Sequence, residues 1–190
     1  MKSLPPKILL FLLLQDFLTA ENWPAWRGKD ATGSTGAGQY PSELNLQKNL
    51  QWKAPLPEKG CSTPIVWEDS ILLTSPLEGQ DAILSFSLDG ERKWQTTVGP
   101  ERKGRHLNGS GSNPSVVTDG ERLYALFKSG NLACLDFSGT ILWQKDLSGY
   151  GKDTLYWDFG TSPILSSRLL IVALMRKGNS WLLAFEPKSG

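Results

Sequence analysis

The sequence predicts an all-β fold, a β-propeller of four-stranded antiparallel blades of which this chain would hold about three. The chain repeats itself with a period near 49 residues, and periods of about 40 to 50 residues with several short strands are typical of propellers. The 190 residues include 19 glycines, 12 prolines and 8 tryptophans, a composition that favours short strands and many turns. After the first twenty residues, no stretch shows the sustained 3.6-residue apolar spacing of a helix.

The repeat is marked by prolines, glycines and tryptophans at equivalent places. Three prolines begin equivalent strands at steps of 50 and 49 residues, and three glycines close equivalent turns at steps of 49 and 51 residues. A tryptophan follows each of the first two glycines by four residues, and another precedes the first repeat. The third repeat stops at its glycine, so we expect its blade to be incomplete. The markers are Pro64, Pro114, Pro163, Gly90, Gly139, Gly190, Trp52, Trp94 and Trp143.

The second repeat shows the expected plan of one blade most clearly. Its four apolar-rich stretches are "PSVVTD", "ERLYALF", "NLACLDF" and "TILWQKDL", and two-residue links that end in glycine join them. Such links favour the tight turns of antiparallel hairpins because glycine adopts positive φ without strain. Four consecutive antiparallel strands make one propeller blade. The first repeat follows the same plan, and the third supplies three of the four stretches.

We expect the repeated tryptophans to fill the gaps between neighbouring blades. An indole buries roughly 200 Å² and keeps one N–H that can donate to a nearby carbonyl. Small residues (Ser87, Cys134, Ala184) would leave room for a neighbouring ring, and acidic side chains, Glu186 among them, would accept hydrogen bonds from turn amides. The residues expected to dock the blades are Trp52, Trp94, Trp143, Asp89, Asp136, Gly90 and Gly139.

The first twenty residues are typical of a secretory signal peptide. Lys2 and Lys7 precede an apolar run over residues 8–14, and the small Ala20 suits the position before a cleavage site. The run is too short to anchor the chain across a bilayer, although a buried N-terminal helix is the alternative. We therefore expect an exported protein, periplasmic or secreted, without a membrane span. The expected organisation is a signal peptide at 1–20, a lead segment at 21–49 and blades at 50–190, divided near 50–98, 99–147 and 148–190.

Charge excludes some partners. Without Lys2, Lys7 and Asp16 of the leader, the chain keeps 18 basic and 18 acidic residues of its 20 and 19. A balanced chain lacks the electrostatic footprint of a protein that binds nucleic acid or an anionic membrane surface.

The sequence lacks the residue combinations of common catalytic and metal sites. His106 is the only histidine, which excludes zinc sites with two histidine ligands, and no Gly-x-Ser-x-Gly elbow accompanies it. Cys61 and Cys134 are too far apart in sequence for a zinc or redox motif. They could form one disulfide in an oxidising compartment, or Cys134 could be a buried free thiol. We predict no catalytic residue and no metal site.

Two stretches carry a family resemblance. "CLDFSGTILW" and "AFEPKSG" resemble the tryptophan-docking motif of the pyrroloquinoline-quinone-like (PQQ-like) β-propellers, Ala-x-Asp-x-x-Thr-Gly-Lys-x-x-Trp. The second fits its spacing through the glycine, with Ser189 in place of threonine, whereas the copies ending at Trp143 and Trp94 are shorter. "NWPAWRG" at 22–28 is similar to the start of many secreted bacterial members. The resemblance covers about residues 22–190 and implies the fold more than an activity.

What the resemblance implies about cofactors depends on the branch of the family. Its dehydrogenases hold a quinone and calcium at the propeller axis, with an acidic base and, in several, adjacent cysteines. This chain has no Cys-Cys pair, and its acids lie mostly in turns. We therefore expect no cofactor. The alternative is that the chain is a fragment of a PQQ-dependent quinoprotein dehydrogenase whose catalytic residues lie beyond Gly190, which would use PQQ with calcium.

Two long connections are the candidate binding surface. Residues 98–114 and 147–163 link the last strand of one repeat to the first of the next, and long loops on a rigid scaffold often carry function. Together they offer cations, amides and aromatic rings, which suit an acidic or sugar-like ligand or a protein loop. Solvated charges and a strand that begins at Tyr156-Trp157 are the alternative. The candidate ligand-binding residues are Arg105, His106, Asn108, Tyr156, Trp157 and Asp158.

The sequence thus predicts an exported, non-catalytic scaffold that binds a protein or an extracellular polymer. Two alternatives remain: the chain is part of a quinone-dependent oxidoreductase, or it is an accessory or sensory module of a larger enzyme. An incomplete ring leaves an open blade edge, through which copies of the chain could associate.

Overall fold

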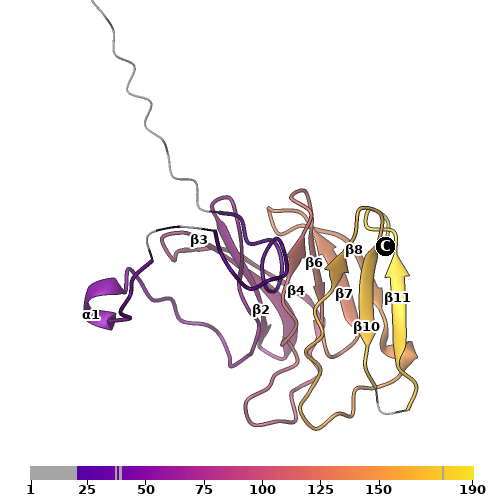
Figure 1. Cartoon of the computed structure of the whole chain (residues 1–190). Coiled ribbons are helices and arrows are strands. Elements are labelled where there is room, and N and C mark those ends of the chain that lie inside the picture. The colour runs from indigo at the N-terminus through magenta and orange to yellow at the C-terminus, as the bar shows by residue number, and fades with distance from the viewer. Residues whose placement is uncertain (1–20, 37, 39, 177) are drawn as a thin grey trace, which may run out of the picture.

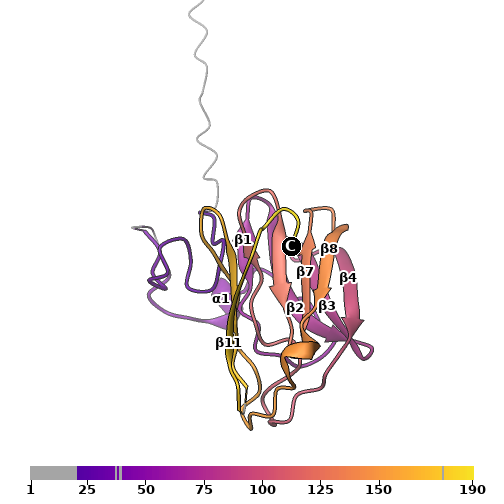
Figure 2. The same ribbon diagram turned by 90° about the vertical axis from the view of Figure 1, so that its right-hand side faces the viewer.

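The computed structural model describes residues 21–36, 38, 40–176 and 178–190, so the predicted signal peptide lies outside the described residues. The described chain forms three antiparallel sheets, which Figure 1 shows in a row with the third at one end; Figure 2 views the row from that end. The sheets contain β1 (Ile65–Trp67), β2 (Ser70–Leu77), β3 (Gln80–Ser87) and β4 (Arg92–Pro100); β5 (Val117–Thr118), β6 (Leu123–Leu126), β7 (Asn131–Leu135) and β8 (Ile141–Asp146); and β9 (Ile164–Leu165), β10 (Leu170–Leu174) and β11 (Trp181–Phe185).

Strands that follow one another in sequence are also neighbours in each sheet, which is the arrangement of a propeller blade. The described helices are short: α1 (Leu46–Asn49) and a 3₁₀ turn, η1 (Ser148–Tyr150). In the part of the chain that the structure describes, no helix is long and apolar enough to cross a membrane. The row of sheets is not closed into a ring. The predicted all-β fold, with about three blades of a larger propeller, is confirmed.

The core lies between the sheets, and the middle sheet is buried on both faces. Side chains alternate along its strands, so that Leu123 and Ala125 of β6 pack toward the first sheet while Tyr124 and Leu126 pack toward the third. All four are fully buried. The first interface also contains Ile65, Leu72, Ile83 and Phe127, and the second also contains Leu132, Phe159, Leu170 and Val172.

Repeated tryptophans join successive sheets. Trp94 on β4 donates from Nε1 to the Phe137 carbonyl in the β7–β8 turn of the second sheet, at 2.9 Å. Trp143 on β8 repeats the contact with the Pro187 carbonyl, just after β11, at 2.9 Å. Each indole therefore spans the gap to the next sheet and satisfies its N–H there, as expected for ring-shaped packing of blades.

The first sheet receives the same contact from the segment that precedes it. Trp52 donates from Nε1 to the Leu88 carbonyl at 2.8 Å. Its ring lies over Gly90, where a Cβ atom would stand 2.4 Å from the indole. Gly90 also has a backbone φ of 82°, a value that residues with a Cβ atom rarely adopt. The glycine is therefore required both by the turn and by the close approach of the ring.

A β-bulge lies beside Trp94 and another lies beside Trp143. Ser85 pairs with Trp94 whereas Phe86 pairs with Arg92, which leaves one extra residue on β4. The same irregularity follows the Cys134–Trp143 pair in the second sheet. Beyond the bulge, the regular alternation of β4 places Trp94, Thr96 and Val98 on the face toward the second sheet.

The register corrects the predicted role of Asp89. Since Ser85 and Cys134 are equivalent, the counterpart of Asp136 is Ser87, two residues before Asp89. Asp136 accepts hydrogen bonds from the backbone of its own turn, as predicted. In the first turn, the Ser87 hydroxyl accepts from the amides of Asp89 and Glu91 at 3.3 and 3.2 Å. Ser87 therefore accepts the turn hydrogen bonds that Asp89 was expected to accept.

The lead segment packs along the first strands of two sheets. Trp23 exchanges backbone hydrogen bonds with Val66 of β1, at 2.7 and 3.0 Å, and Thr118 of β5 donates to the Pro24 carbonyl at 3.0 Å. The segment thus adds to the edges of both sheets.

Candidate functional site

The long connections between sheets gather on one edge of the molecule. Residues 101–116 run from β4 to β5 and residues 147–163 run from β8 to β9. Figure 1 shows both at its lower edge, opposite the upper edge where the chain ends. The β6–β7 turn lies at the same edge, because Lys128 in that turn contacts residues of both connections. The scaffold therefore presents these loops together.

Asp158 fastens the two connections to each other. Its carboxylate accepts from the backbone N–H groups of Arg105 and His106, at 2.8 Å each, and from the ammonium of Lys128. Its φ of 66° is uncommon for a residue other than glycine, although Asp tolerates it better than most. Arg105 also donates to the Thr154 carbonyl at 3.0 Å. The loops are therefore held by charge-assisted hydrogen bonds.

Exposed aromatic rings lie next to the Asp158 contacts. The His106 ring lies 4.5 Å from the Trp157 ring and 5.4 Å from the Tyr156 ring, measured between centroids. Tyr156 and Trp157 nevertheless remain 66% and 72% exposed, and Leu107 beside them is 80% exposed. The alternative in which Tyr156-Trp157 begins a strand is wrong, because β9 begins only at residue 164.

A small cavity opens beside the rings. It has a volume of about 270 Å³ and is lined by Cys61, His106, Asn108, Gly109, Asn113, Trp157, Asp158 and Gly160. The Cys61 thiol donates to the Asn108 carbonyl at 2.8 Å, which closes one wall. We call Arg105, His106, Leu107, Asn108, Tyr156 and Trp157 the loop patch.

The structure brings all six predicted ligand-binding residues together, but it gives one of them a different position. Asp158 is only 8% exposed and is surrounded by its own donors, so it supports the patch from below. Burial raises the pKa of Asp158, and the hydrogen bonds from Lys128, His106 and Arg105 outweigh that effect and bring the pKa below its ordinary value. The carboxylate is therefore ionised and fixed.

Lys128 is the functional residue that the sequence does not reveal. It precedes a Ser-Gly turn, where a lysine is usually solvated, yet its side chain is fully buried. Its ammonium donates to Asp158 and to the Lys103 carbonyl, and lies 3.9 Å from Asp153. A buried charge must be paired. The unbroken run of apolar, buried residues from β6 (Leu123–Leu126) through Phe127 is the one sequence signal that reaches this turn.

A second buried carboxylate joins the first two sheets near the same edge. Asp81 at the start of β3 accepts from Asn131 at 2.9 Å and from the hydroxyls of Ser129 and Ser112. Its side chain is inaccessible to solvent. Burial, with a smaller contribution from the charge of Glu101, raises the pKa of Asp81 to about 7 in spite of these hydrogen bonds.

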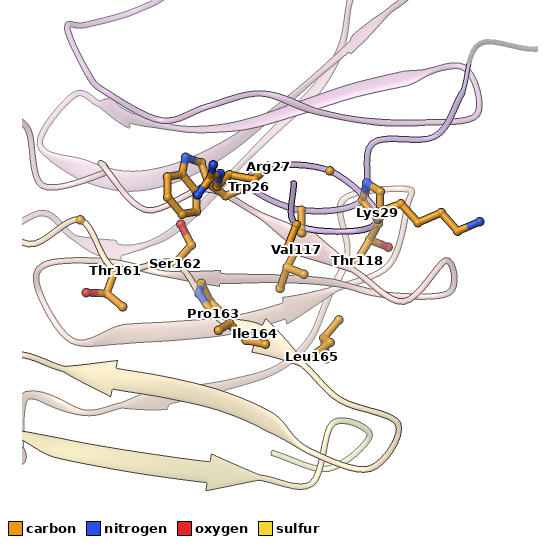
Figure 3. A pocket seen from close by; sticks show the side chains of 15 residues that line it. Trp26, Arg27, Lys29, Val117, Thr118, Thr161, Ser162, Pro163, Ile164 and Leu165 are labelled. Atoms are coloured by element: carbon orange, nitrogen blue, oxygen red, sulfur yellow. The ribbon is translucent and has the colours of Figure 1, made fainter. Parts of the chain in front are cut away.

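A larger cavity lies between the lead segment and the first strands of the second and third sheets. Its volume is about 830 Å³, and Figure 3 shows the side chains around it. Trp26 and Arg27 form one side, with the guanidinium 5.4 Å from the indole centroid. The lead residues in its wall are 24–29 and Ala31; the strand-side residues are Val117, Thr118 and 160–165. The wall is mainly apolar, with cations at the rim.

Neither a metal cluster nor a disulfide is formed by the described residues. No three His, Cys, Asp or Glu side chains among them are grouped as metal ligands. Both cysteines are free thiols: Cys61 is exposed and Cys134 is buried. Burial raises the pKa of the Cys134 thiol to about 12, so it behaves as a small apolar residue in the core.

A known family matches this architecture. The family model described as "Outer membrane protein assembly factor BamB" matches residues 44–190, which include all three sheets. The chain belongs to this PQQ-like repeat family. No curated protein matches the chain significantly in sequence.

Solved structures share the fold of this chain. The quinohemoprotein alcohol dehydrogenase from Comamonas testosteroni superposes with a TM-score of 0.68 over 90% of this chain and 26% of its own, at 17% identity. A europium-containing methanol dehydrogenase gives 0.50 over 67% and 23%, at 14% identity. A quinohemoprotein alcohol dehydrogenase from Pseudomonas putida HK5 gives 0.50 over 72% and 20%, at 17% identity. The chain thus spans about a quarter or less of these structures, and the likeness shows the fold alone.

Proposed function

We propose that this chain is part of an exported, non-catalytic binding propeller, and that the loop patch docks a segment of a partner protein. Support comes from its composition: tryptophan, tyrosine and arginine are the side chains that most often dominate protein–protein binding energy. The patch also includes Leu107, which is 80% exposed, and exposed apolar side chains that gather in one place mark interaction sites.

One observation carries the proposal: exposed rings are held in a fixed position by a buried ion pair. Lys128 and Asp158 are both buried, and Asp158 binds the amides that precede the His106 ring. The rings of Tyr156 and Trp157 then pack against that histidine. A surface that is ordered before binding loses less conformational entropy when the partner arrives. The exposed side chains of Leu107, Tyr156 and Trp157 do not contribute to the buried core, so the fold itself does not explain their exposure.

The second candidate is part of a PQQ-dependent dehydrogenase, favoured by the fold of the solved neighbours. Calcium takes six to eight oxygen ligands, several of them carboxylates. Among the described residues no such group of acids forms, and Asp153 and Asp158 already face Lys128. The residues present therefore do not fit the metal that accompanies the quinone, and no residue of this chain is given a role in quinone chemistry.

Site-specific crosslinking tests the proposal. A photoreactive p-benzoylphenylalanine replaces Leu107 in the protein as its host produces it, and an equivalent substitution at Leu142, 48% exposed on β8, serves as the matched control. We expect one exported protein to be crosslinked from position 107 and not from position 142. With that partner purified, Trp157→Ala should weaken binding by about tenfold or more, as at other interface hot spots, while Trp26→Ala should leave it unchanged.

Other outcomes separate the alternatives. Crosslinks from both positions, or from neither, would contradict a protein-binding role of the patch. Retention on an extracellular polysaccharide that depends on Trp157 would assign the patch to a polymer ligand instead. A shifted absorbance on addition of PQQ and calcium, together with dye-linked alcohol oxidation, would establish the dehydrogenase and overturn the non-catalytic reading.

A further inference from the structure

A third cavity contains a buried guanidinium that lacks hydrogen-bond partners on two of its nitrogens among the described residues. Arg176 follows β10 and is 6% exposed, yet its Nε and Nη1 atoms have no hydrogen-bond partner among the described residues. Its guanidinium carbon lies over the Phe159 ring, 5.4 Å from the centroid, in a cation–π contact. An unpaired buried charge is costly, and an anion bound in the cavity would offset that cost.

The nearest charges do not replace that anion. Asp153 attracts Arg176 but does not form an ion pair with it, and Arg102 repels it. Burial is the largest of these effects, and the pKa of Arg176 lies below its ordinary value. One oxygen of Asp153 also has no hydrogen-bond partner among the described residues and lies 3.9 Å from Lys128. The group around Arg176 therefore keeps a positive excess.

The cavity in front of Arg176 combines this charge with aromatic walls. It measures about 340 Å³ and is lined by Gly149, Tyr150, Gly151, Lys152, Arg176, Asn179 and Trp181. Tyr150 and Trp181 lie edge to face with centroids 5.8 Å apart, and both are about two-fifths exposed, at 42% and 44%. Lys152 adds a second cation and Asn179 an amide. Two adjacent sheets contribute to it, because residues 149–152 follow β8 whereas Arg176 lies in the connection between β10 and β11 and Trp181 begins β11.

We propose that this cavity binds one acidic sugar unit, a pyranose that carries a carboxylate or a sulfate group. A planar guanidinium binds two oxygens of such an anion at once. The aromatic pair offers an apolar face to the sugar ring, and Asn179 can exchange hydrogen bonds with hydroxyls. The volume lies at the small end of the range for ligand pockets, which suits a single unit of a chain more than a peptide. This site is separate from the loop patch, since the two share no lining residue.

Calorimetric titration of the protein as its host produces it tests the inference. The probes are tri-galacturonate, its methyl ester, a sulfated heparin disaccharide and inorganic sulfate. We expect tri-galacturonate or the disaccharide to bind, and the neutral methyl ester to bind at least about tenfold more weakly, because it lacks the charge-assisted hydrogen bonds. Tighter binding of one acid over the other identifies the carboxylate or the sulfate as the preferred group.

Variants divide the site into its parts. Arg176→Gln should abolish binding, and Arg176→Lys should restore only part of it because the paired donors are lost. Since Arg176 is buried, exposed Lys152→Gln and Trp181→Ala provide the independent test: each should weaken binding of the acidic probe several-fold and leave the melting temperature unchanged. Trp157→Ala should not alter saccharide binding, and Lys152→Gln should not alter partner crosslinking at position 107. The proposal for the loop patch and the proposal for this cavity can therefore be contradicted independently of each other.

Three results would overturn the inference. The methyl ester could bind as well as the acid, or neither acidic probe could bind at millimolar concentration. Alternatively, inorganic sulfate could bind as tightly as the saccharides, which would leave an anion site with no sugar specificity.

Discussion

The indole N–H of Trp94 donates to the Phe137 carbonyl at 2.9 Å, and the same ring covers Gly139, where a Cβ atom would lie 2.8 Å away. One side chain thus connects the last strand of the first sheet to a turn of the second. Because Trp52 and Trp143 make the corresponding contacts, cohesion between sheets depends on a contact that recurs with every repeat.

Replacing Trp94 by phenylalanine should therefore destabilise the protein strongly. The smaller ring leaves a gap at the seam, and the Phe137 carbonyl loses its donor, which costs about 1 to 3 kcal/mol where the carbonyl stays buried. Urea denaturation measures the loss. The matched control is Trp157→Phe, whose ring is 72% exposed and which should change the free energy of unfolding by no more than about 0.5 kcal/mol. Equal effects of the two substitutions would contradict a docking role for Trp94.

Substitution of the glycine beneath the ring tests the contact from the other side. Gly139 has a φ of 87° and meets the Trp94 ring closely, so Gly139→Ala should destabilise by more than about 1 kcal/mol through backbone strain and displacement of the indole. Gly149→Ala is the control, because a Cβ atom there would meet nothing within 4 Å. Thermal melting of both variants, with tryptophan fluorescence to report the displaced ring, decides the matter. A variant at position 139 as stable as the one at 149 would refute the explanation.

The sequence predicted the architecture well because the architecture is periodic. Turn glycines and tryptophans recur once per blade, and each satisfies a local requirement of φ, ring packing or hydrogen bonding that any copy of the repeat must meet. Asp89 is the exception that shows the limit. Its resemblance to Asp136 was misleading, since Asp136 lies three residues before its turn glycine whereas Asp89 directly precedes Gly90, so that Ser87 is the equivalent position.

The candidate sites were less predictable because they depend on contacts between residues some thirty to fifty apart. Loop composition identified the exposed residues of the loop patch, but only the fold shows that Asp158 anchors them from below. Lys128 and Arg176 follow apolar strands, in the position of ordinary solvated turn residues. Both are buried because neighbouring sheets pack over them. A local sequence pattern does not reveal that packing.

The anchor beneath the loop patch should behave as a coupled pair. Lys128→Met leaves the buried Asp158 carboxylate without its ammonium and should cost about 3 to 5 kcal/mol, whereas Lys128→Met combined with Asp158→Asn should cost less than the sum of the two single changes. Limited proteolysis within residues 101–116 should become faster in the single variant as the loops loosen. Additive effects in a double-mutant cycle, or an unchanged cleavage rate, would show that the ion pair does not hold the loops.

Asp81 gives the fold a pH dependence near neutrality. Its folded-state pKa of about 7 lies above the ordinary 3.8. Below the lower value both folded and unfolded chains are protonated at this site. Between the two values only the folded chain keeps the proton, so stability falls as the pH rises and reaches a plateau above the higher value.

Asp81→Asn should remove this dependence while preserving the shape of the side chain and its contacts with Ser129 and Asn131. Between pH 5 and pH 8 the wild-type protein should lose about 3 kcal/mol relative to the variant, since nearly two pH units lie between pH 5 and the folded pKa of about 7 and each corresponds to about 1.4 kcal/mol. Urea denaturation across that range provides the comparison, and Asp89→Asn in an exposed turn controls for the change in net charge. Parallel stability curves for wild type and Asp81→Asn would mean that Asp81 is already ionised in the folded protein, and that the hydrogen bonds from Ser129, Asn131 and Ser112 outweigh the effect of its burial.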